Sequence, residues 1–290
     1  KLDRRIELGL ADRRYVETTP IQSVTIPAVL EGVDLIGCAE TGTGKTAAFL
    51  LPIMQRLLAG DRDGQGGTRV LILAPTRELA VQIEDEFQGL AYHTSLSVAA
   101  VYGGVPGGPQ ERALTAGADV VVATPGRLLD HMSSGSTRFE ALDVLVLDEA
   151  DRLLDMGFWP DVRRIVSALP SSRQTLFFSA TMSEDVFKSA KEIMREPKLV
   201  QVGQTTMPDT ITHVGAEVPS GEKAGWLARF LRETGGPAIV FVRTKRGADR
   251  LASRLASAGI RCAALHADRT QSERTRAVEG FKSGRYTTLV

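Results

Sequence analysis

The alternation of short apolar runs with helical patterns constrains the fold of this 290-residue chain more than any other feature of its sequence. Within residues 1–203, the apolar runs predict strands over 33–38, 69–74, 97–102, 119–123, 143–148, 174–179 and 198–202. The intervening patterns predict helices over 45–59, 77–91, 109–116, 125–133, 160–168 and 183–194. This order is typical of an α/β domain with a mostly parallel, doubly wound sheet.

A polar stretch at 204–222, rich in glycine and proline, predicts a linker with one edge strand over 210–218. After this linker the alternation begins again. The second series predicts helices over 223–233, 246–258 and 271–282 and strands over 238–242, 261–265 and 287–290. We therefore expect two doubly wound domains. Because the chain stops inside the last strand-like run, we expect the second domain, 223–290, to be incomplete.

Composition narrows the class of protein. Hydrophobic residues make up 43% of the chain, which is enough for a real core. Lys+Arg and Asp+Glu number 35 each, so any contact with nucleic acid must be a local patch and not an overall basic field. The two cysteines lie far apart, which argues against a disulfide framework or a zinc site. With no membrane-length apolar stretch and no secretory h-region in the first residues, we expect a cytoplasmic protein.

The segment AETGTGKT, residues 39–46, joins the first predicted strand to the first predicted helix. It fits the phosphate-binding pattern G-x-x-x-x-G-K-[ST], except that Ala39 stands in place of the first glycine. The glycines let backbone N–H groups face phosphate oxygens, Lys45 reaches the outer phosphates, and the Thr46 hydroxyl can bind Mg²⁺. A glycine-rich turn with a surface lysine is the alternative, which the flanking strand and helix disfavour. The predicted nucleotide-binding residues of this segment are Thr41, Gly42, Thr43, Gly44, Lys45 and Thr46.

Three carboxylates, Asp148, Glu149 and Asp151, follow the predicted strand VLVL. Alone they fit a solvated acidic loop as well as a site at the carboxyl end of a parallel sheet, where open α/β sheets place ligands. The phosphate-binding segment favours the site, because Mg²⁺ needs a hard oxygen ligand from a second strand. Asp148 is the candidate for the metal, and Glu149 for orienting or deprotonating the attacking water. The predicted catalytic residues are Lys45, Asp148 and Glu149.

Together, the acidic and phosphate-binding segments resemble those of the DEAD-box ATP-dependent RNA helicases. Further motifs of that family follow in order: TTPIQ (18–22), PTREL (75–79), GG (103–104), TPGR (124–127), SAT (179–181), VFVRT (240–244) and a Q-x-x-R motif at 271–274. The wording of VVATPGRLLDHM is similar to a bacterial, RhlE-like branch. The resemblance implies two RecA-like domains that close on ATP, Mg²⁺ and single-stranded or short duplex RNA, and we expect a monomer.

The resemblance also implies roles for individual residues. Gln22 would read the adenine edge, while Asp151, Ser179 and Thr181 would couple the nucleotide site to the RNA side. Sequence-independent RNA contacts would come from Pro75, Thr76, Arg77, Gly104, Thr124, Pro125, Gly126, Arg127, Arg243, Thr244, Gln271 and Arg274. Taken singly, several motifs have structural alternatives. Gln22 alone fits a solvated helix residue, Thr76 a helix cap, TPGR a turn, and SAT a cap for the helix that follows it.

We therefore expect an ATP-dependent RNA helicase, a hydrolase that couples ATP to RNA binding and to local unwinding or remodelling of RNA–protein complexes. A DNA helicase or another P-loop ATPase is disfavoured by the PTREL, TPGR and SAT set. An ATP-gated RNA clamp would need the same site, so the motifs leave that alternative open. The family's last two motifs, one of them arginine-rich, would lie beyond Val290, so we expect little RNA-stimulated hydrolysis from this chain.

Overall fold

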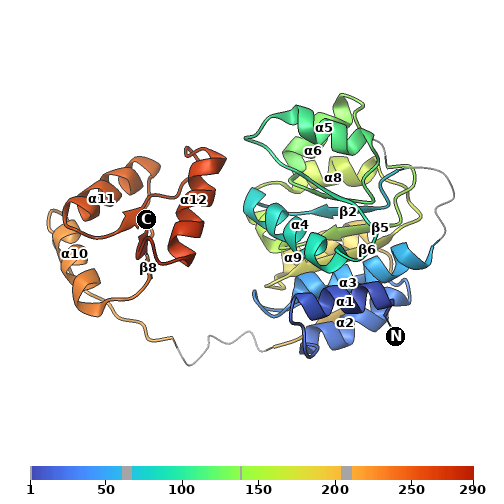
Figure 1. Cartoon of the computed structure of the whole chain (residues 1–290), viewed down its shortest axis with the longest axis horizontal. Helices are drawn as coiled ribbons and strands as arrows, with labels where there is room; N and C mark the ends of the chain where they lie inside the picture. The colour runs from blue at the N-terminus through green and yellow to red at the C-terminus, as the bar shows by residue number, and fades with distance from the viewer. Residues whose placement is uncertain (1, 61–66, 138, 204–210) are drawn as a thin grey trace. The chain divides into compact units, whose positions relative to one another are not determined.

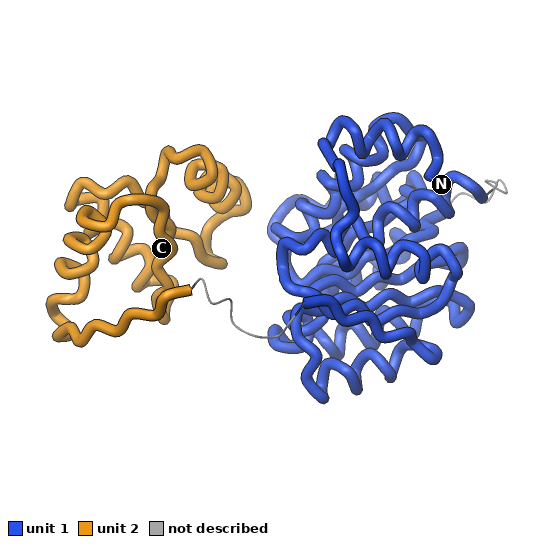
Figure 2. Tube along the Cα trace, turned by 90° about the horizontal axis from the view of Figure 1, so that it is seen from below, with its two compact units in different colours: residues 1–206 blue, residues 207–290 orange. Residues whose placement is uncertain are grey.

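The computed structural model describes residues 2–60, 67–137, 139–203 and 211–290. The chain divides into two compact units, residues 1–206 and 207–290, which Figure 2 draws in different colours. Each unit has a parallel sheet and a hydrophobic core of its own. None of the helices in the described ranges is both long enough and apolar enough to cross a membrane.

Unit 1 is built on a seven-stranded sheet in the order β3-β4-β2-β5-β6-β1-β7, with every neighbouring pair parallel. The strands are β1 (Leu35–Cys38), β2 (Val70–Leu73), β3 (Val98–Val101), β4 (Val120–Ala123), β5 (Val144–Leu147), β6 (Gln174–Ser179) and β7 (Lys198–Gln201). A parallel sheet with helical crossovers confirms the predicted α/β class.

Helices cover both faces of this sheet and form two hydrophobic cores. The first core contains residues of α1 (Arg4–Asp12), α2 (Pro20–Leu30), α3 (Lys45–Ala59) and α4 (Arg77–Ala91). The second contains residues of α5 (Gly107–Thr115), α6 (Pro125–Ser133), α7 (Ala150–Asp155), α8 (Trp159–Ser167) and α9 (Glu184–Ile193). Figure 1 shows α1, α2 and α3 on one side of the strands and α5, α6 and α8 on the other.

Strand β5 shows why its sequence is apolar throughout. Val144 and Val146 pack in the first core, whereas Leu145 and Leu147 pack in the second. Successive side chains of a strand point to opposite faces, so a strand covered on both sides needs apolar residues at every position. Burying each such side chain contributes about 1.5–3 kcal/mol, which holds the following acidic residues on a rigid base.

Unit 2 has a small parallel sheet in the order β8-β10-β9. Its strands are β8 (Ala238–Ile239), β9 (Cys262–Ala263) and β10 (Thr288–Leu289), and its helices are α10 (Lys223–Thr234), α11 (Lys245–Ser257) and α12 (Gln271–Lys282). The two right-handed crossovers run in opposite directions across this sheet, so α11 and α12 cover opposite faces, as Figure 1 shows.

Three helices, α1, α2 and α7, lie outside the predicted set, and the prediction of a strand over 210–218 is wrong where the structure describes it. Residues 211–218 form no strand, and residue 210 lies outside the described residues. Val214 is 87% exposed, so the segment buries no apolar face, and a strand persists only where a neighbour takes up its backbone hydrogen bonds. The predicted strand 238–242 is shorter for the same reason, since Phe241 is 91% exposed.

Candidate functional site

A cleft of about 390 Å³ lies where the loops after β1 and β5 face each other in unit 1. All strands of this sheet are parallel, so both loops leave the sheet at the same edge, separated only by β6. The predicted residues that line the cleft are Thr41, Gly42, Gly44, Lys45, Thr46, Asp148 and Glu149. Of the segment 41–46, only Thr43 does not line it, and its hydroxyl donates to the Glu40 carbonyl at 2.7 Å.

The loop depends on glycine at two positions. Gly42 and Gly44 have φ values of 82° and 89°, in the left-handed region that other residues rarely adopt. At Gly44 a side chain is also excluded sterically, because a Cβ there would lie 2.5 Å from Gln22 Nε2. The loop thus turns directly into α3, whose N-terminus points its backbone N–H groups into the cleft region.

Gln22 is buried behind this loop and supports it. Its Oε1 accepts from the Thr19 backbone N–H at 2.9 Å, and its Nε2 donates to the Gly44 carbonyl at 3.1 Å. Gln22 is only 2% exposed and does not line the cleft. The alternative of a solvated helix residue is therefore wrong, while the adenine contact stays a prediction.

Lys45 and Asp148 bring opposite charges into the cleft. Lys45 is 7% exposed and its Nζ donates to the Ala39 carbonyl at 2.6 Å, an interaction that phosphate oxygens can replace. Asp148 is 3% exposed, and burial raises the pKa of its carboxyl to about 6 although Lys45 opposes that rise. A cation beside such a buried carboxyl stabilises its charged form.

A magnesium ion fits this donor set. Among the described residues no group of three or more His, Cys, Asp or Glu side chains is placed to hold a metal. Mg²⁺ needs no such cage, because it keeps several waters and takes only one or two protein oxygens beside phosphate oxygens. Thr46 and Asp148 both line the cleft and supply a hydroxyl and a carboxylate of that kind.

Glu149 has an unusual backbone. With φ 48° and ψ 51° it is a non-glycine residue in the left-handed region at the start of α7, which costs about 1–3 kcal/mol. Arg152 Nη1 donates to its Oε2 at 2.7 Å and so orients the carboxylate. The spacing of three residues on a helix was the available signal for this pair.

Asp151 holds the SAT segment. Its Oδ2 accepts from the backbone N–H groups of Ala180 and Thr181 at 3.2 and 3.0 Å, and from the Thr181 hydroxyl at 3.0 Å. Ser179 Oγ donates to the Thr181 carbonyl at 2.7 Å. The helix α9 is capped by Ser183, so the alternative that SAT caps this helix is wrong. The structure thus brings together the three residues assigned to coupling.

Tyr15, Gln82 and Glu86 also line the cleft, and sequence reasoning missed all three. The Tyr15 hydroxyl donates to Glu86 Oε1 at 2.7 Å. Burial and the Glu86 carboxylate raise the pKa of Tyr15 to about 12, so its phenol stays a donor. Gln82 and Glu86 are one helical turn apart on α4, but no local pattern shows which face of α4 meets the phosphate-binding loop.

A second group of predicted residues gathers where β2, β3 and β4 end. Thr76 caps α4, accepting from the Leu79 backbone N–H at 3.2 Å, so the cap alternative is correct for this residue. Arg77 lies against Gly104, where its guanidinium occupies the space that a Cβ would need. Arg127 Nη2 donates to the Val105 carbonyl at 3.0 Å. Both arginines therefore hold the loop after β3.

The remaining residues of this group begin two helices. Pro75 precedes α4, and Thr124, Pro125 and Gly126 form the start of α6 together with Arg127.

In unit 2, Thr244 caps α11 by accepting from the Gly247 backbone N–H at 3.0 Å. Arg243 precedes this cap, and Gln271 and Arg274 occupy the first turn of α12. The loop before α12 reaches α11, because Lys245 Nζ lies 2.6 Å from Asp268 Oδ1.

Two family models match the chain. The model described as DEAD/DEAH box helicase matches residues 19–189, and the model described as helicase conserved C-terminal domain matches residues 222–290. These matches cover the lining of the cleft in unit 1, except Tyr15, and the helices of unit 2. The geometry of the cleft and the order of the motifs agree with the matched family.

Similar proteins come from plants, bacteria and archaea. DEAD-box ATP-dependent RNA helicase 30 of Arabidopsis thaliana is 45% identical over 282 residues, which cover 96% of this chain and 48% of the relative. ATP-dependent RNA helicase CshA of Listeria monocytogenes is 40% identical over 292 residues, covering 100% of this chain and 55% of that protein. The crystal structure of a DEAD box protein from Methanococcus jannaschii matches with a TM-score of 0.65 and 34% identity, covering 100% of this chain and 77% of that one. The chain thus spans about half the length of these curated relatives.

Proposed function

The chain belongs to the DEAD/DEAH box helicase family, and on that premise we propose that it couples ATP binding and hydrolysis to sequence-independent RNA binding and to local unwinding or remodelling of RNA–protein complexes. The observation that carries this proposal is the cleft in which Lys45 and Thr46 face Asp148 and Glu149. Hydrolysis of a γ-phosphate requires a phosphate-binding loop opposite a metal ligand and a carboxylate that orients water, and the lining of this cleft supports that assignment.

Each side chain of the cleft has one task in this proposal. The backbone of 41–44 and Lys45 bind the phosphates of ATP, while Thr46 and Asp148 hold Mg²⁺, which neutralises charge on the phosphate oxygens. Glu149 orients the attacking water and accepts its proton, with Arg152 fixing the direction of its carboxylate. Gln22 supports the loop, and its contact with adenine remains part of the proposal.

RNA is the proposed partner of the second group. Arg77 and Arg127 give charge-assisted bonds to phosphates, and Gly104 and Gly126 are exposed, which lets backbone amides approach the same oxygens. Contacts of this kind do not read bases, so binding is independent of sequence and weakens as salt rises. The other proposed contacts are Pro75, Thr76, Thr124, Pro125, Arg243, Thr244, Gln271 and Arg274.

Coupling between the two groups runs through Asp151, Ser179 and Thr181. Asp151 follows the water-orienting Glu149 by two residues and carries the SAT segment on its carboxylate, which supports this assignment. We further propose a monomeric, cytoplasmic protein of a bacterial, RhlE-like branch. The wording of VVATPGRLLDHM supports the branch, and sedimentation analysis tests the monomer.

Replacing Glu149 by Gln tests the proposal. In the whole protein, we expect ATP to bind as before while hydrolysis falls by about 10²–10⁴-fold, because the amide cannot accept a proton. Glu31→Gln, at an exposed position, is the control and leaves hydrolysis unchanged. Retained hydrolysis in Glu149→Gln would contradict the proposed role. Strand displacement, measured beside RNA binding with a non-hydrolysable nucleotide, separates an unwinding enzyme from an RNA clamp.

A further inference from the structure

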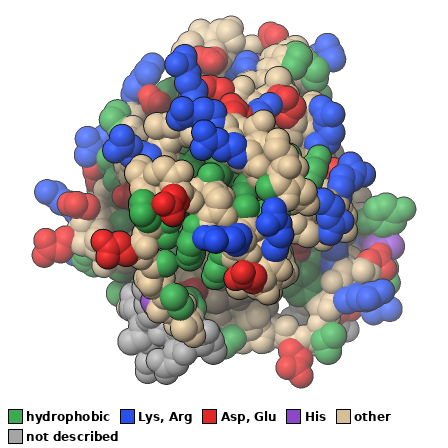
Figure 3. Space-filling model, turned by 90° about the vertical axis from the view of Figure 1, so that its left-hand side faces the viewer, with side chains coloured by type: hydrophobic (Ala, Val, Ile, Leu, Met, Phe, Trp, Pro, Cys, Tyr) green, Lys and Arg blue, Asp and Glu red, His purple; other side chains and the backbone are tan. Residues whose placement is uncertain are grey.

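The neutral chain is made of two oppositely charged parts. Residues 207–290 carry 14 Lys and Arg against 8 Asp and Glu, a net charge of +6. Residues 1–206 carry 21 against 27, a net charge of −6. Lys and Arg side chains stand out in several groups on the face drawn in Figure 3. A basic field therefore exists on unit 2 although the balance of the whole chain conceals it.

Part of this charge forms a stripe along α11. Arg246, Arg250 and Arg254 are four residues apart, and all three are exposed. Positions four apart lie on one side of a helix, about 6 Å from each other along the axis. Among the described residues none of these three guanidinium groups has an acidic partner. We name Arg246, Arg250 and Arg254 the basic face of α11.

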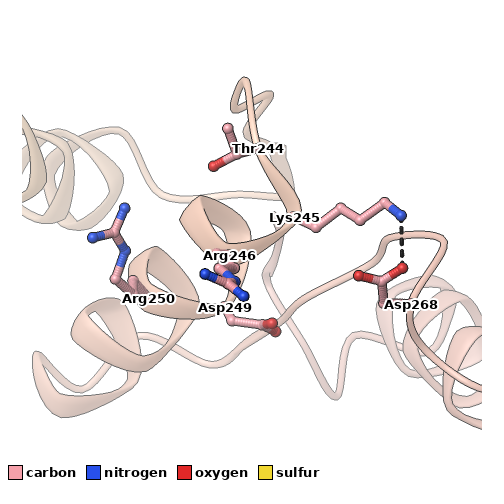
Figure 4. A pocket seen from close by; sticks show the side chains of 6 residues that line it. All are labelled: Thr244, Lys245, Arg246, Asp249, Arg250 and Asp268. Atoms are coloured by element: carbon pink, nitrogen blue, oxygen red, sulfur yellow. Dashed lines mark hydrogen bonds and ion pairs between the residues drawn. The ribbon is translucent and has the colours of Figure 1, made fainter.

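Neighbouring carboxylates do not neutralise the basic face, because other cations already bind them. Asp268 pairs with Lys245 at 2.6 Å, and Asp249 pairs with Arg269 and with His266 Nε2, the latter at 3.0 Å. Figure 4 shows Lys245 reaching towards Asp268, with Arg250 turned away from both carboxylates. These residues border an open cleft of about 740 Å³ lined by Thr244, Lys245, Arg246, Asp249, Arg250 and Asp268. The cleft and the helix beyond it form one cationic surface that begins at Thr244.

The surroundings of the stripe indicate which partner it suits. Besides its basic residues, the exposed positions of α11 are Ser253, Ala256 and Ser257, with no large apolar side chain among them. The exposed large apolar residues described in unit 2 lie outside α11, at Ile211, Val214, Phe230, Ile239, Phe241 and Val242. A protein partner would need an apolar centre for its interface, whereas a phosphate backbone needs only well-placed cations.

We propose that the basic face of α11 binds the phosphate backbone of RNA that continues past Thr244, outside the contacts assigned above. This inference rests on the proposed RNA binding, which it extends by an added anchoring surface. Three guanidinium groups spread over about 12 Å of helix can bind successive phosphates of one strand without reading its bases. Longer RNA therefore binds more tightly than RNA that reaches only the motif residues.

The test compares two double variants that lose the same charge. Arg250→Gln with Arg254→Gln removes two members of the basic face and keeps Arg246, which borders Thr244. Lys282→Gln with Arg285→Gln is the control, because both residues are exposed and lie at and beyond the end of α12 on the opposite side of the sheet. Circular dichroism establishes that both variants fold. Affinity for oligouridylates of about 6 and about 20 nucleotides is then measured as a function of salt, whose effect counts the neutralised phosphates.

For the long RNA, the slope of log affinity against log salt should fall by about 1.4 in the α11 variant, since each lost contact with a single strand contributes about 0.7. At 0.1 M salt this corresponds to a loss of roughly 10–30-fold. Both variants should bind the short RNA as tightly as the unchanged protein does. The control variant should also bind the long RNA as tightly. If the unchanged protein binds no RNA, the proposed function itself fails. If the unchanged protein binds RNA and the α11 variant binds the long RNA with the same affinity and salt dependence, the inference is overturned.

Discussion

At the residue scale, Gly44 is the position where backbone and packing constraints coincide. Its φ of 89° already disfavours a side chain, and a Cβ would lie 2.5 Å from Gln22 Nε2. We expect Gly44→Ala to push Gln22 away and to weaken ATP binding by at least about tenfold, since strain of this kind costs about 1–3 kcal/mol. Gly42→Ala is the matched control, because φ is 82° but nothing lies within 4 Å of the added Cβ. Equal losses in a nucleotide titration of both variants would show that the contact with Gln22 is unimportant.

Asp151 offers a second test at this scale. Its Oδ2 accepts all three hydrogen bonds from the SAT segment while its Oδ1 accepts from the Arg152 backbone N–H at 3.1 Å, and an amide loses the charge and can accept at only one of these two positions. We expect Asp151→Asn to lower the free energy of unfolding of unit 1 by about 1–3 kcal/mol. Asp155→Asn, exposed at the end of the same helix, should change it little. Urea unfolding measures both, and similar values for the two variants would contradict the anchoring role.

Four of the residues that line the cleft could be predicted to meet there because they stand in two adjacent pairs in the sequence. Lys45 and Thr46 belong to a fixed loop pattern, and Asp148 and Glu149 directly follow a buried strand, so parallel topology brings both pairs to one edge of the sheet. The supporting contacts could not be predicted in this way. The bond from Gln22 to the Gly44 carbonyl joins segments 22 residues apart, and its existence depends on how α2 is rotated against α3.

At the element scale, the central strands β1, β2, β4 and β5 of unit 1 were predictable, since each is buried at every position and reads as a short apolar run. Helix α2 was not, because its sequence PIQSVTIPAVL contains β-branched residues and an internal proline that disfavour a helix. Its N-terminus is stabilised by the Gln22 side chain, whose Oε1 accepts from the Thr19 backbone N–H at 2.9 Å, and its body packs on α3. Tertiary packing has thus overridden the local preference.

Gly9 of α1 and Gly89 of α4 both lie where these helices pack together, but a Cβ would meet different kinds of atom at the two positions. A Cβ on Gly9 would overlap the backbone carbonyl of Leu90, whereas a Cβ on Gly89 would overlap the guanidinium of Arg13. A backbone cannot move aside without separating the helices, but the end of an arginine side chain can. We expect Gly9→Ala to reduce the free energy of unfolding by about 1–3 kcal/mol.

Gly89→Ala should cost less, because the end of the Arg13 side chain can move aside. Alanine is favoured over glycine inside a helix by about 1 kcal/mol at both positions, and at Gly89 this gain offsets the displacement of Arg13. Thermal or urea unfolding of the two variants checks the order. A larger loss in Gly89→Ala would mean that the ion pairs of Arg13 with Asp85 and Glu86 hold α1 more firmly than the helix contact does.

At the scale of the whole molecule, the two units differ in how much apolar surface they bury. Among the described residues of unit 2, the buried hydrophobic side chains are Ala228, Ala248, Leu255, Ile260, Ala277, Leu289 and Val290, none of which is aromatic. The cores of unit 1 contain fully buried Phe49, Phe87 and Phe177 together with many aliphatic residues. Since stability rises with buried apolar area, we expect unit 2 to unfold first.

The two tryptophans allow this order to be measured, because Trp159 lies in unit 1 and Trp226 in unit 2. Trp226→Phe leaves fluorescence from unit 1 alone, and Trp159→Phe leaves fluorescence from unit 2 alone. We expect the Trp226 signal to change at the lower urea concentration, with a free energy of unfolding smaller by at least about 2 kcal/mol. Trp159 is 7% exposed, so replacing it weakens unit 1 and should not move the Trp226 transition if the units unfold independently. Coincident midpoints in both variants would instead mean that the chain unfolds as one cooperative body.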